Sequence, residues 1–415
     1  MDFAIVSLVF LVLTIIIGLK TKQNVGLIAL MMAYILCRIS GTPETDMIKG
    51  FNTGLFIMLL GVMILFGVAQ VNGTMELIAK KIVALTGSRT KLIPFVIYLV
   101  SILISSVGPG ALAGLILMSV FSMSLAKEMK VSPLLLGAMG FFGTNVGGVC
   151  PVAVNGIILD TLAREAGQPP VSTSIMANEF IVVTLTVVAL YFFYGGQKIN
   201  VASPFKFNEL PAFHAMQRIT LAGIALMVLC VFTFKANVGL ISFFIATILL
   251  LLDAADSKAV LGTIGWNTII LITGFGVLMK IIIGLGGIAL LAKTIGSFMN
   301  AFVAPGIVAL IGSAMSLFSS VSGVVLPTVA TMIPDIIHTL NGGNYKELAT
   351  AMSVGAHIAG ISPFTGGAII LSAYETILNE SAQEREAFYY GLMKIALAAT
   401  IFAALFSLLG VYKLV

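Results

Sequence analysis

The sequence has 415 residues, of which 59% are hydrophobic and only 9% are charged, and its formal net charge is +5. A mean hydropathy of +1.12 excludes a soluble globular domain and indicates a polytopic membrane protein. The modest positive charge gives no sign of a nucleic-acid partner, because basic residues in short loops orient a membrane protein.

The first half of the chain is residues 1–195. Two scaffold spans at 3–39 are followed by a longer part at 51–195, which we expect to move during transport. Within that part, two apolar arms flank a short polar stretch. The first arm falls short of the roughly 20 residues that a crossing needs, so a re-entrant hairpin is predicted at 92–125. A later span is interrupted near 147–155.

A polar linker at 196–218, expected on the cytoplasmic side, leads to the second half, residues 219–415. The order of the first half is repeated there. Scaffold spans at 219–252 precede the second transport part at 264–415, which contains a second predicted hairpin at 302–338. Another interrupted span follows that hairpin.

Short motifs recur in the same order in both halves, which indicates a duplication. Five crossings in each half would place the second half upside down. The sequence therefore predicts an all-α polytopic membrane protein with an inverted repeat, about ten transmembrane helices, two re-entrant hairpins and two discontinuous helices. The clearest repeated motifs are NVGLI at 24–28 and 237–241, GFNT at 50–53 with GWNT at 265–268, and SSV at 105–107 and 319–321.

Basic residues are more frequent in the loops that this arrangement places on one side. By the positive-inside rule that side is cytoplasmic, so both termini are expected outside the cell inner (plasma) membrane. The scaffold spans are the expected contact of a homodimer, and the remaining apolar surface is expected to face lipid.

The hairpin tips and span interruptions are small, hydroxyl-rich breaks. A break of this kind survives in a bilayer only where it is buried in protein or lines a cavity. The N–H end of a broken helix suits a carboxylate, and the C=O end with Ser or Asn oxygens suits Na⁺. Gly and Ser also simply allow membrane helices to pack closely. Recurrence of the breaks at matched positions favours a binding site.

Two sequence stretches carry a resemblance to a known family. GTNVGGVCPVAVN at 143–155 is similar to the broken-helix signature of the divalent-anion/Na⁺ symporters, and SPFTG at 362–366 is its weaker partner. With the two hydroxyl-tipped hairpins, the layout resembles these symporters and the wider ion transporter superfamily. Among its branches, the compact chain resembles the MatC-type dicarboxylate carriers most. Both tips have Ser-Ser-Val where dicarboxylate symporters have Ser-Asn-Thr.

The resemblance implies Na⁺ as the coupling ion, bound at two sites, and one substrate site. The implied Na⁺ ligands are Ser105, Ser106 and Gly148 in one site and Ser319, Ser320 and Gly360 in the other. The implied substrate-facing residues are Ser106, Cys150, Pro151, Asn155, Ser320, Ser322, Ser362, Pro363 and Thr365. Thr144 and Asn145 of the first motif are additional candidates.

Two ionisable residues in apolar segments are candidates by default. Lys280 is either a fixed cation that meets a substrate carboxylate or a lysine that extends to the outer interface. His357, which precedes a break, is either a proton carrier or a hydrogen-bonded packing residue. The histidines and cysteines lack metal-ligand spacing, so no bound cofactor is expected.

These features predict a secondary active transporter of small organic anions, foremost C3–C4 dicarboxylates. Uptake would be coupled to Na⁺ or to H⁺ by an elevator-type movement. An anion exchanger or exporter without Na⁺ coupling, with Lys280 as the fixed charge, is the first alternative, and an anion channel is the second. Enzymatic activity is not expected, because no nucleophile with a placed base and no phosphate-binding loop occurs.

Overall fold

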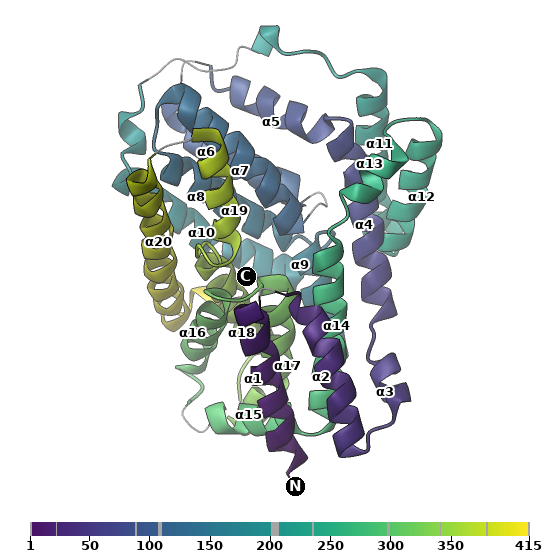
Figure 1. Cartoon of the computed structure of the whole chain (residues 1–415). Helices are drawn as coiled ribbons and strands as arrows, with labels where there is room; N and C mark the ends of the chain where they lie inside the picture. Colours follow the sequence, from purple (N-terminus) through teal and green to yellow (C-terminus); the bar gives the residue numbers. More distant parts are fainter. Residues whose placement is uncertain are drawn as a thin grey trace.

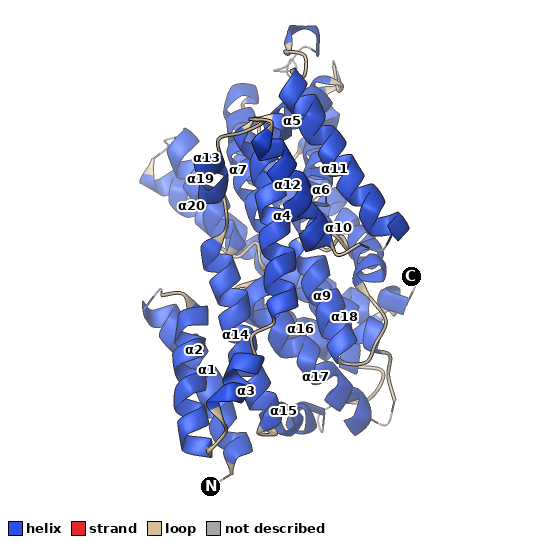
Figure 2. Cartoon of the chain, turned by 90° about the vertical axis from the view of Figure 1, so that its right-hand side faces the viewer, coloured by secondary structure: helices blue, strands red, loops and turns tan. Residues whose placement is uncertain are grey.

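The structure is a computed structural model that describes residues 2–21, 23–87, 89–106, 110–200, 207–234, 236–296, 299–340, 342–378 and 381–413. Three residues of the first predicted hairpin tip, Val107, Gly108 and Pro109, lie outside this set. Over the described residues every regular element is a helix (Figure 2). Six helical stretches are long and apolar enough to cross a membrane. They are Glu44–Val71, Ala111–Met129, Ser172–Phe193, Trp266–Gly284, Val321–Thr339 and Ala382–Leu408.

The helices of the first half follow the predicted order. They are α1 (Phe3–Thr21), α2 (Val25–Ser40), α3 (Glu44–Lys49), α4 (Thr53–Val71), α5 (Thr74–Ala84), η1 (Thr90–Leu92), α6 (Ile93–Ser106), α7 (Gly110–Met129), α8 (Pro133–Gly148), α9 (Val154–Glu165), α10 (Ser172–Phe193) and η2 (Gly196–Lys198).

The linker and the second half continue the series. Their helices are η3 (Phe207–Glu209), α11 (Ala215–Phe234), α12 (Val238–Leu251), α13 (Ser257–Gly262), α14 (Trp266–Gly284), α15 (Gly287–Gly296), α16 (Ala304–Ser316), the π-helical turn η4 (Val321–Val325), α17 (Leu326–Thr339), α18 (Tyr345–Ala359), α19 (Gly366–Leu378), α20 (Ala382–Leu408) and η5 (Val411–Lys413).

The repeated NVGLI motif forms the same local structure twice. Asn24 is the N-cap of α2 and accepts a hydrogen bond from the Gly26 N–H, and Asn237 caps α12 by accepting from the Gly239 N–H. An Asn side chain satisfies one of the free N–H groups that begin every helix. The repeated motif is therefore a helix-start signal in both halves.

Glycines let the two halves cross backbone to backbone at two places. A Cβ on Gly26 of α2 would overlap the backbone of α14 at Ile270 and Leu271, and a Cβ on Gly61 of α4 would overlap Gly239 of α12. Each crossing therefore joins one helix from each half, with a glycine of a NVGLI motif at its centre. Small residues at such crossings are the usual means of close helix packing in membranes.

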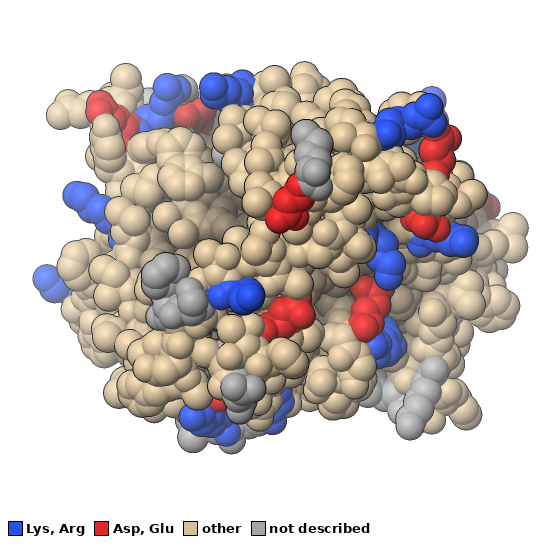
Figure 3. Space-filling view, turned by 90° about the horizontal axis from the view of Figure 1, so that it is seen from below, with Lys and Arg blue, Asp and Glu red and all other residues tan. Residues whose placement is uncertain are grey.

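The matched elements of the halves lie at opposite ends of the molecule. The pair α1 and α2 lies at the end that carries the N-terminus, whereas α11 and α12 lie at the other end (Figures 1 and 2). Between them, α4 and α14 run beside a bundle formed by α6–α10 and α16–α20 (Figure 1). Seen from the N-terminal end, acidic and basic side chains are mixed, without a single-sign patch (Figure 3).

The predicted interruptions are present. Helix α8 ends at Gly148 and α9 begins at Val154, and α18 ends at Ala359 and α19 begins at Gly366. Helix also stops between Ser316 and η4, at the second predicted hairpin tip. In each half, the arm before the tip packs closely against the first part of the broken helix, α6 on α8 and α16 on α18.

Candidate functional site

A cavity of about 320 Å³ lies where four helices begin. Its lining includes a residue from the first turn of each of these helices: Ala111 of α7, Asn155 of α9, Ser322 of η4 and Gly366 of α19. Further polar groups come from α8, from the start of α14 and from the breaks of the second half. These are Asn145, Thr268, Ser320 and Thr365. The volume and mixed lining are typical of a small-molecule site.

The helix starts give this cavity its electrostatic character. Backbone N–H groups of a first helical turn have no partner within the helix, and the helix dipole adds partial positive charge there. None of the described residues that line the cavity carries a charged side chain. Four positive helix ends without a fixed cation suit a small anion with several acceptor oxygens.

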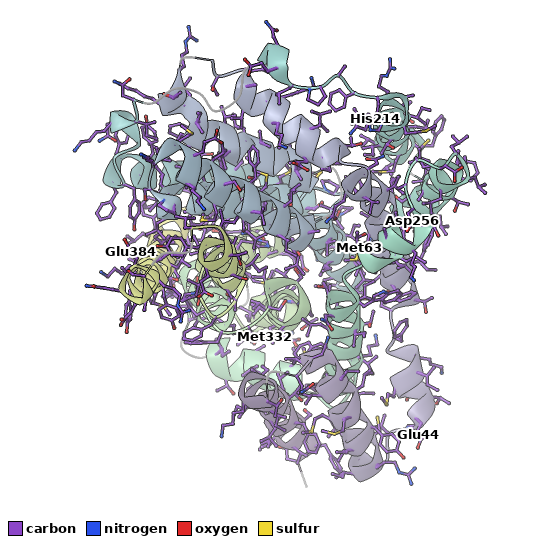
Figure 4. The ribbon with its side chains drawn as sticks, turned by 45° about the horizontal axis from the view of Figure 1, so that its top comes forward. Glu44, Met63, His214, Asp256, Met332 and Glu384 are labelled. Atoms are coloured by element: carbon purple, nitrogen blue, oxygen red, sulfur yellow. The ribbon has the colours of Figure 1, made fainter. Side chains whose placement is uncertain are left out.

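A second, smaller cavity of about 90 Å³ adjoins the first and shares Asn155, Thr268 and Ser322 with it. Its outer wall is α4, through Met63, which Figure 4 places near the middle of the molecule. The candidate site thus lies between the broken-helix bundle and α4.

Asn155 connects the cavity to a buried polar chain. Its side-chain oxygen accepts a 2.5 Å hydrogen bond from the Ser322 hydroxyl, and its amide nitrogen lies 2.7 Å from Nε2 of His357. On the other side of the ring, Nδ1 lies 3.1 Å from Oε1 of Glu179. The Ser353 hydroxyl donates to Oε2 of Glu179 over 3.3 Å. Hydrogen bonds thus run from the cavity wall to a fully buried carboxylate.

Serine hydroxyls attach the hairpin arms to the broken helices. Ser105 of α6 donates to the Thr144 carbonyl of α8 over 2.7 Å, and Ser316 of α16 donates to the Ala356 carbonyl of α18 over 2.6 Å. Ser105 and Ser316 thus make the same kind of contact in the two halves. Ser319, which the sequence repeat pairs with Ser105, lies beyond the end of α16.

The second break is held together by Ser362 and Thr365. The Ser362 hydroxyl is fully buried and donates to the Leu317 carbonyl over 2.7 Å. The Thr365 hydroxyl lies 3.1 Å from the carbonyl oxygen of Gly360 and 3.2 Å from that of Ser316. The Thr365 hydroxyl therefore contacts one carbonyl oxygen at the end of α16 and another at the end of α18.

The structure brings some of the predicted residues together and separates others. Asn145, Asn155, Ser320, Ser322, Gly360 and Thr365 line the main cavity. Thr144 is buried and its hydroxyl bonds the Phe141 carbonyl, and Pro363 is buried in the second break. Cys150 and Pro151 are half-buried in the first break, next to the buried Gly148. The Ser106 hydroxyl is buried and has no hydrogen-bond partner among the residues that the structure describes.

Lys280 lies elsewhere. Its exposed side chain lines a separate cavity of about 80 Å³ with Asn52 and Glu165. That cavity touches the C-terminal part of α9, whereas the main cavity touches its first turn. In this conformation Lys280 is not among the residues that line the main cavity.

Glu179 was missed by sequence reasoning. It is fully buried in α10, in the stretch Ser172–Phe193 that is apolar enough to cross a membrane. A lone carboxylate in such a segment is a functional candidate by default, and that signal was available. Its partner His357 was noticed, but 178 positions separate the two residues. Among the described residues, no group of three or more His, Cys, Asp or Glu side chains is placed to hold a metal ion. His214, another histidine of the chain, lies at the periphery of the molecule (Figure 4).

Comparison with known proteins agrees with a transporter. Residues 1–148 match the family described as dicarboxylate carrier protein MatC N-terminus. The YdaH transporter of Alcanivorax borkumensis is similar in fold, with a TM-score of 0.61 and 13% identity over 99% of this chain and 98% of that chain. MtrF of Neisseria gonorrhoeae is also similar, with a TM-score of 0.59 and 14% identity over 99% and 94%.

No curated protein matches the chain in sequence. At these identities the two structures show the fold alone. The six apolar stretches among the described residues indicate a multi-pass membrane protein, and its fold is similar to that of the two solved transporters. The comparisons are also consistent with the expectation that the protein is not an enzyme.

Proposed function

We propose that the protein is a secondary active transporter of small organic anions, with C3–C4 dicarboxylates such as malonate and succinate as first candidates. The observation that carries this proposal is the meeting of four helix starts at one cavity. The match of residues 1–148 to the MatC dicarboxylate carriers supports the choice of substrate class.

The two ends of a dicarboxylate would have separate partners in the cavity. Asn155 and Ser322 form one wall, and at the second break the Ser320 hydroxyl faces the cavity while the Thr365 hydroxyl bonds the carbonyls of Gly360 and Ser316. Helix-start N–H groups would stabilise both carboxylates without a fixed cation. Release then needs no salt bridge to be broken, which suits a carrier that must bind and let go.

We further propose that the halves are inverted repeats and that transport follows an elevator-type movement. The paired crossings of α2 with α14 and of α4 with α12 support a two-fold relation between the halves. In this scheme the broken-helix bundle moves against a frame of crossed helices. A homodimer through the exposed faces of α2 and α12 completes the scheme, with Leu27, Met31, Leu240 and Phe244 directed outward.

Coupling to a cation completes the proposal. The helix ends at Gly148 and Gly360 offer carbonyl oxygens beside hydroxyls, and such oxygens are the ligands that Na⁺ uses at broken helices. Ser106 and Ser320 are the hydroxyl ligands that the family resemblance implies for these two sites. Protons are the other possible coupling ion.

Uptake by proteoliposomes tests the proposal. Purified protein should accumulate [¹⁴C]-succinate or malonate when a Na⁺ or H⁺ gradient is imposed, and unlabelled dicarboxylate should compete. Failure to transport any short di- or tricarboxylate under either gradient contradicts the proposal. Single-molecule currents would identify a channel, because carriers turn over too slowly to give them.

A second candidate function is anion exchange without a cation gradient. The separate cavity with Lys280 favours it, because a fixed cation on the path can take the place of a co-transported one. Retained succinate–succinate exchange with both gradients collapsed, together with its loss in Lys280→Gln, would select this function.

A further inference from the structure

Glu179 and His357 form an isolated acid–base pair in the middle of the protein. Glu179 lies on α10 and His357 on α18, and both side chains have 0% exposure. Nδ1 of the ring lies 3.1 Å from Oε1 and 3.3 Å from Oε2 of the carboxylate. The carboxylate of Glu179 does not line the cavity of the proposed anion site.

The other titratable groups near the pair are accounted for. Phenols of Tyr98 on α6 and Tyr412 on η5 lie within electrostatic reach of Glu179, and they bond Thr184 and the Ala403 carbonyl, respectively. Helix α8 has no titratable residue, and Asp160 of α9 caps the start of α10. On α20 the charged residues are all exposed, and on α17 Asp335 is half-buried and His338 is exposed. Lys413 of η5 pairs with Glu347 of α18. His357 is therefore the cationic partner that the structure gives Glu179.

The buried pair has two protonation states that differ in net charge. With an ionised carboxylate and an imidazolium the pair has no net charge, and with a neutral imidazole it carries one negative charge. An uncompensated charge in a buried, apolar region is costly, so a proton on the pair and a charge in the cavity affect each other. The pair can thus bind and release one proton.

The hydrogen-bond chain links this proton to the cavity. With neutral His357, Nδ1–H donates to Glu179, Nε2 accepts from the Asn155 amide, and Ser322 donates inward to the Asn155 oxygen. The Ser322 proton is then unavailable to the cavity. When Nε2 of His357 is protonated, it must donate a hydrogen bond instead of accepting one. Rotation of the Asn155 amide group would place the Asn155 side-chain oxygen opposite Nε2 as the acceptor.

The rotation reverses the rest of the chain. The Asn155 amide nitrogen then donates to Ser322 Oγ, and the Ser322 O–H is free to donate into the cavity. A carboxylate oxygen bound there is the matching acceptor. Loading the pair with a proton therefore creates a hydrogen-bond donor for the anion, and a bound anion stabilises the loaded pair.

We propose that Glu179 and His357 are a proton-binding site coupled to the anion site through Asn155 and Ser322, so that each anion is transported together with one proton. The inference rests on the proposed anion site. The proton comes from water on the side where the anion binds, resides on the His357 ring, and returns to water when the anion leaves. No redox partner or further reactant is needed.

Proton uptake on binding tests this directly. Succinate binding to the purified full-length protein is measured by calorimetry in choline medium, in buffers of different ionisation enthalpy, at pH values where succinate is fully ionised. We expect up to one proton taken up per succinate. Affinity should strengthen as pH falls, by up to about tenfold per pH unit where the free protein is unloaded and the complex loaded.

Variants of the two residues test whether the proton binds to this pair. Glu179→Gln and His357→Gln should bind succinate with little proton uptake and a flat pH profile. The matched control His338→Gln changes an exposed histidine at the end of α17 and should behave as wild type. Folding is checked by size-exclusion chromatography. If a variant does not fold, wild-type proton uptake still decides whether binding is proton-linked, and Asn155→Ala, which cuts the chain, should abolish the linkage.

The outcomes separate the two proposals. Succinate binding without proton uptake in the wild type overturns the proton site and leaves the anion site intact. Uptake that persists in folded Glu179→Gln and His357→Gln also overturns it. Absence of binding by any short dicarboxylate at any pH, in choline and in Na⁺ medium alike, contradicts the anion site and, with it, this inference.

Discussion

The hydroxyl of Ser322 donates a 2.5 Å hydrogen bond to the side-chain oxygen of Asn155, although 167 positions separate the two residues. Ser322 belongs to the second hairpin region and Asn155 to the first turn of α9, so the bond joins the two halves at the cavity wall. Both residues stand where an anion would bind.

Removal of either side chain should weaken anion binding. Asn155→Ala or Ser322→Ala leaves the other group without its partner and removes one donor from the cavity. We expect succinate affinity to fall by about tenfold or more, as for a lost hydrogen bond to a charged ligand. Calorimetry on the purified protein measures this. The control is Ser124→Ala, on the exposed face of α7, and affinities equal to that control would contradict the site.

The backbone crossings should tolerate no added methyl group. In Gly61→Ala or Gly239→Ala the new Cβ would overlap the backbone of the partner helix, so the helices must move apart. Overpacking of this kind costs about 1–3 kcal/mol. The melting temperature in detergent should fall by several degrees. Gly276→Ala, in α14 with open space around its Cβ, is the control and should melt at or above the wild-type temperature.

Lys280→Gln should change equilibrium binding little in this conformation. The lysine lines a cavity separate from that of Asn155, and its side chain is exposed. We expect succinate affinity within about threefold of wild type, because exposed charges contribute weakly. Uptake measured on the same variant shows whether the lysine acts at another stage. A loss of equilibrium affinity as large as that of Asn155→Ala would place Lys280 in the anion site.

Thr365→Val should loosen the second break, whereas Thr365→Ser should not. Valine has the shape of threonine but cannot donate to the carbonyls of Gly360 and Ser316. We expect a loss of about 1 kcal/mol in stability for the valine variant, as for one buried hydrogen bond. If these carbonyls bind Na⁺, the Na⁺ concentration that half-saturates succinate binding should also rise. Identical behaviour of both variants would assign the hydroxyl no such role.

Local chemistry explains which parts of the architecture could be predicted. Gly, Pro and Ser interrupt helices wherever they gather, so the breaks after Gly148 and Ala359 were visible in the sequence. The Asn of each NVGLI motif caps a helix by its own side chain, which also needs no tertiary information.

Contacts between distant segments could not be predicted in the same way. Ser105 and Ser316 each reach a carbonyl of the broken helix packed beside them, and which hydroxyl reaches which carbonyl depends on how the helices pack. The pairing of Glu179 with His357 depends on α10 packing against α18. Neither relation has a sequence spacing that could reveal it.

The glycine crossings also bear on the origin of the chain. Each one needs a helix from both halves, so a half produced alone would leave its two crossing faces without partners. A protein of half this length could bury those faces only against a second copy of itself. If the halves arose by duplication, a dimer of identical short chains would have preceded the present chain. Co-expression of the separate halves, divided within the linker at 201–206, should reassemble the molecule, whereas either fragment alone should aggregate.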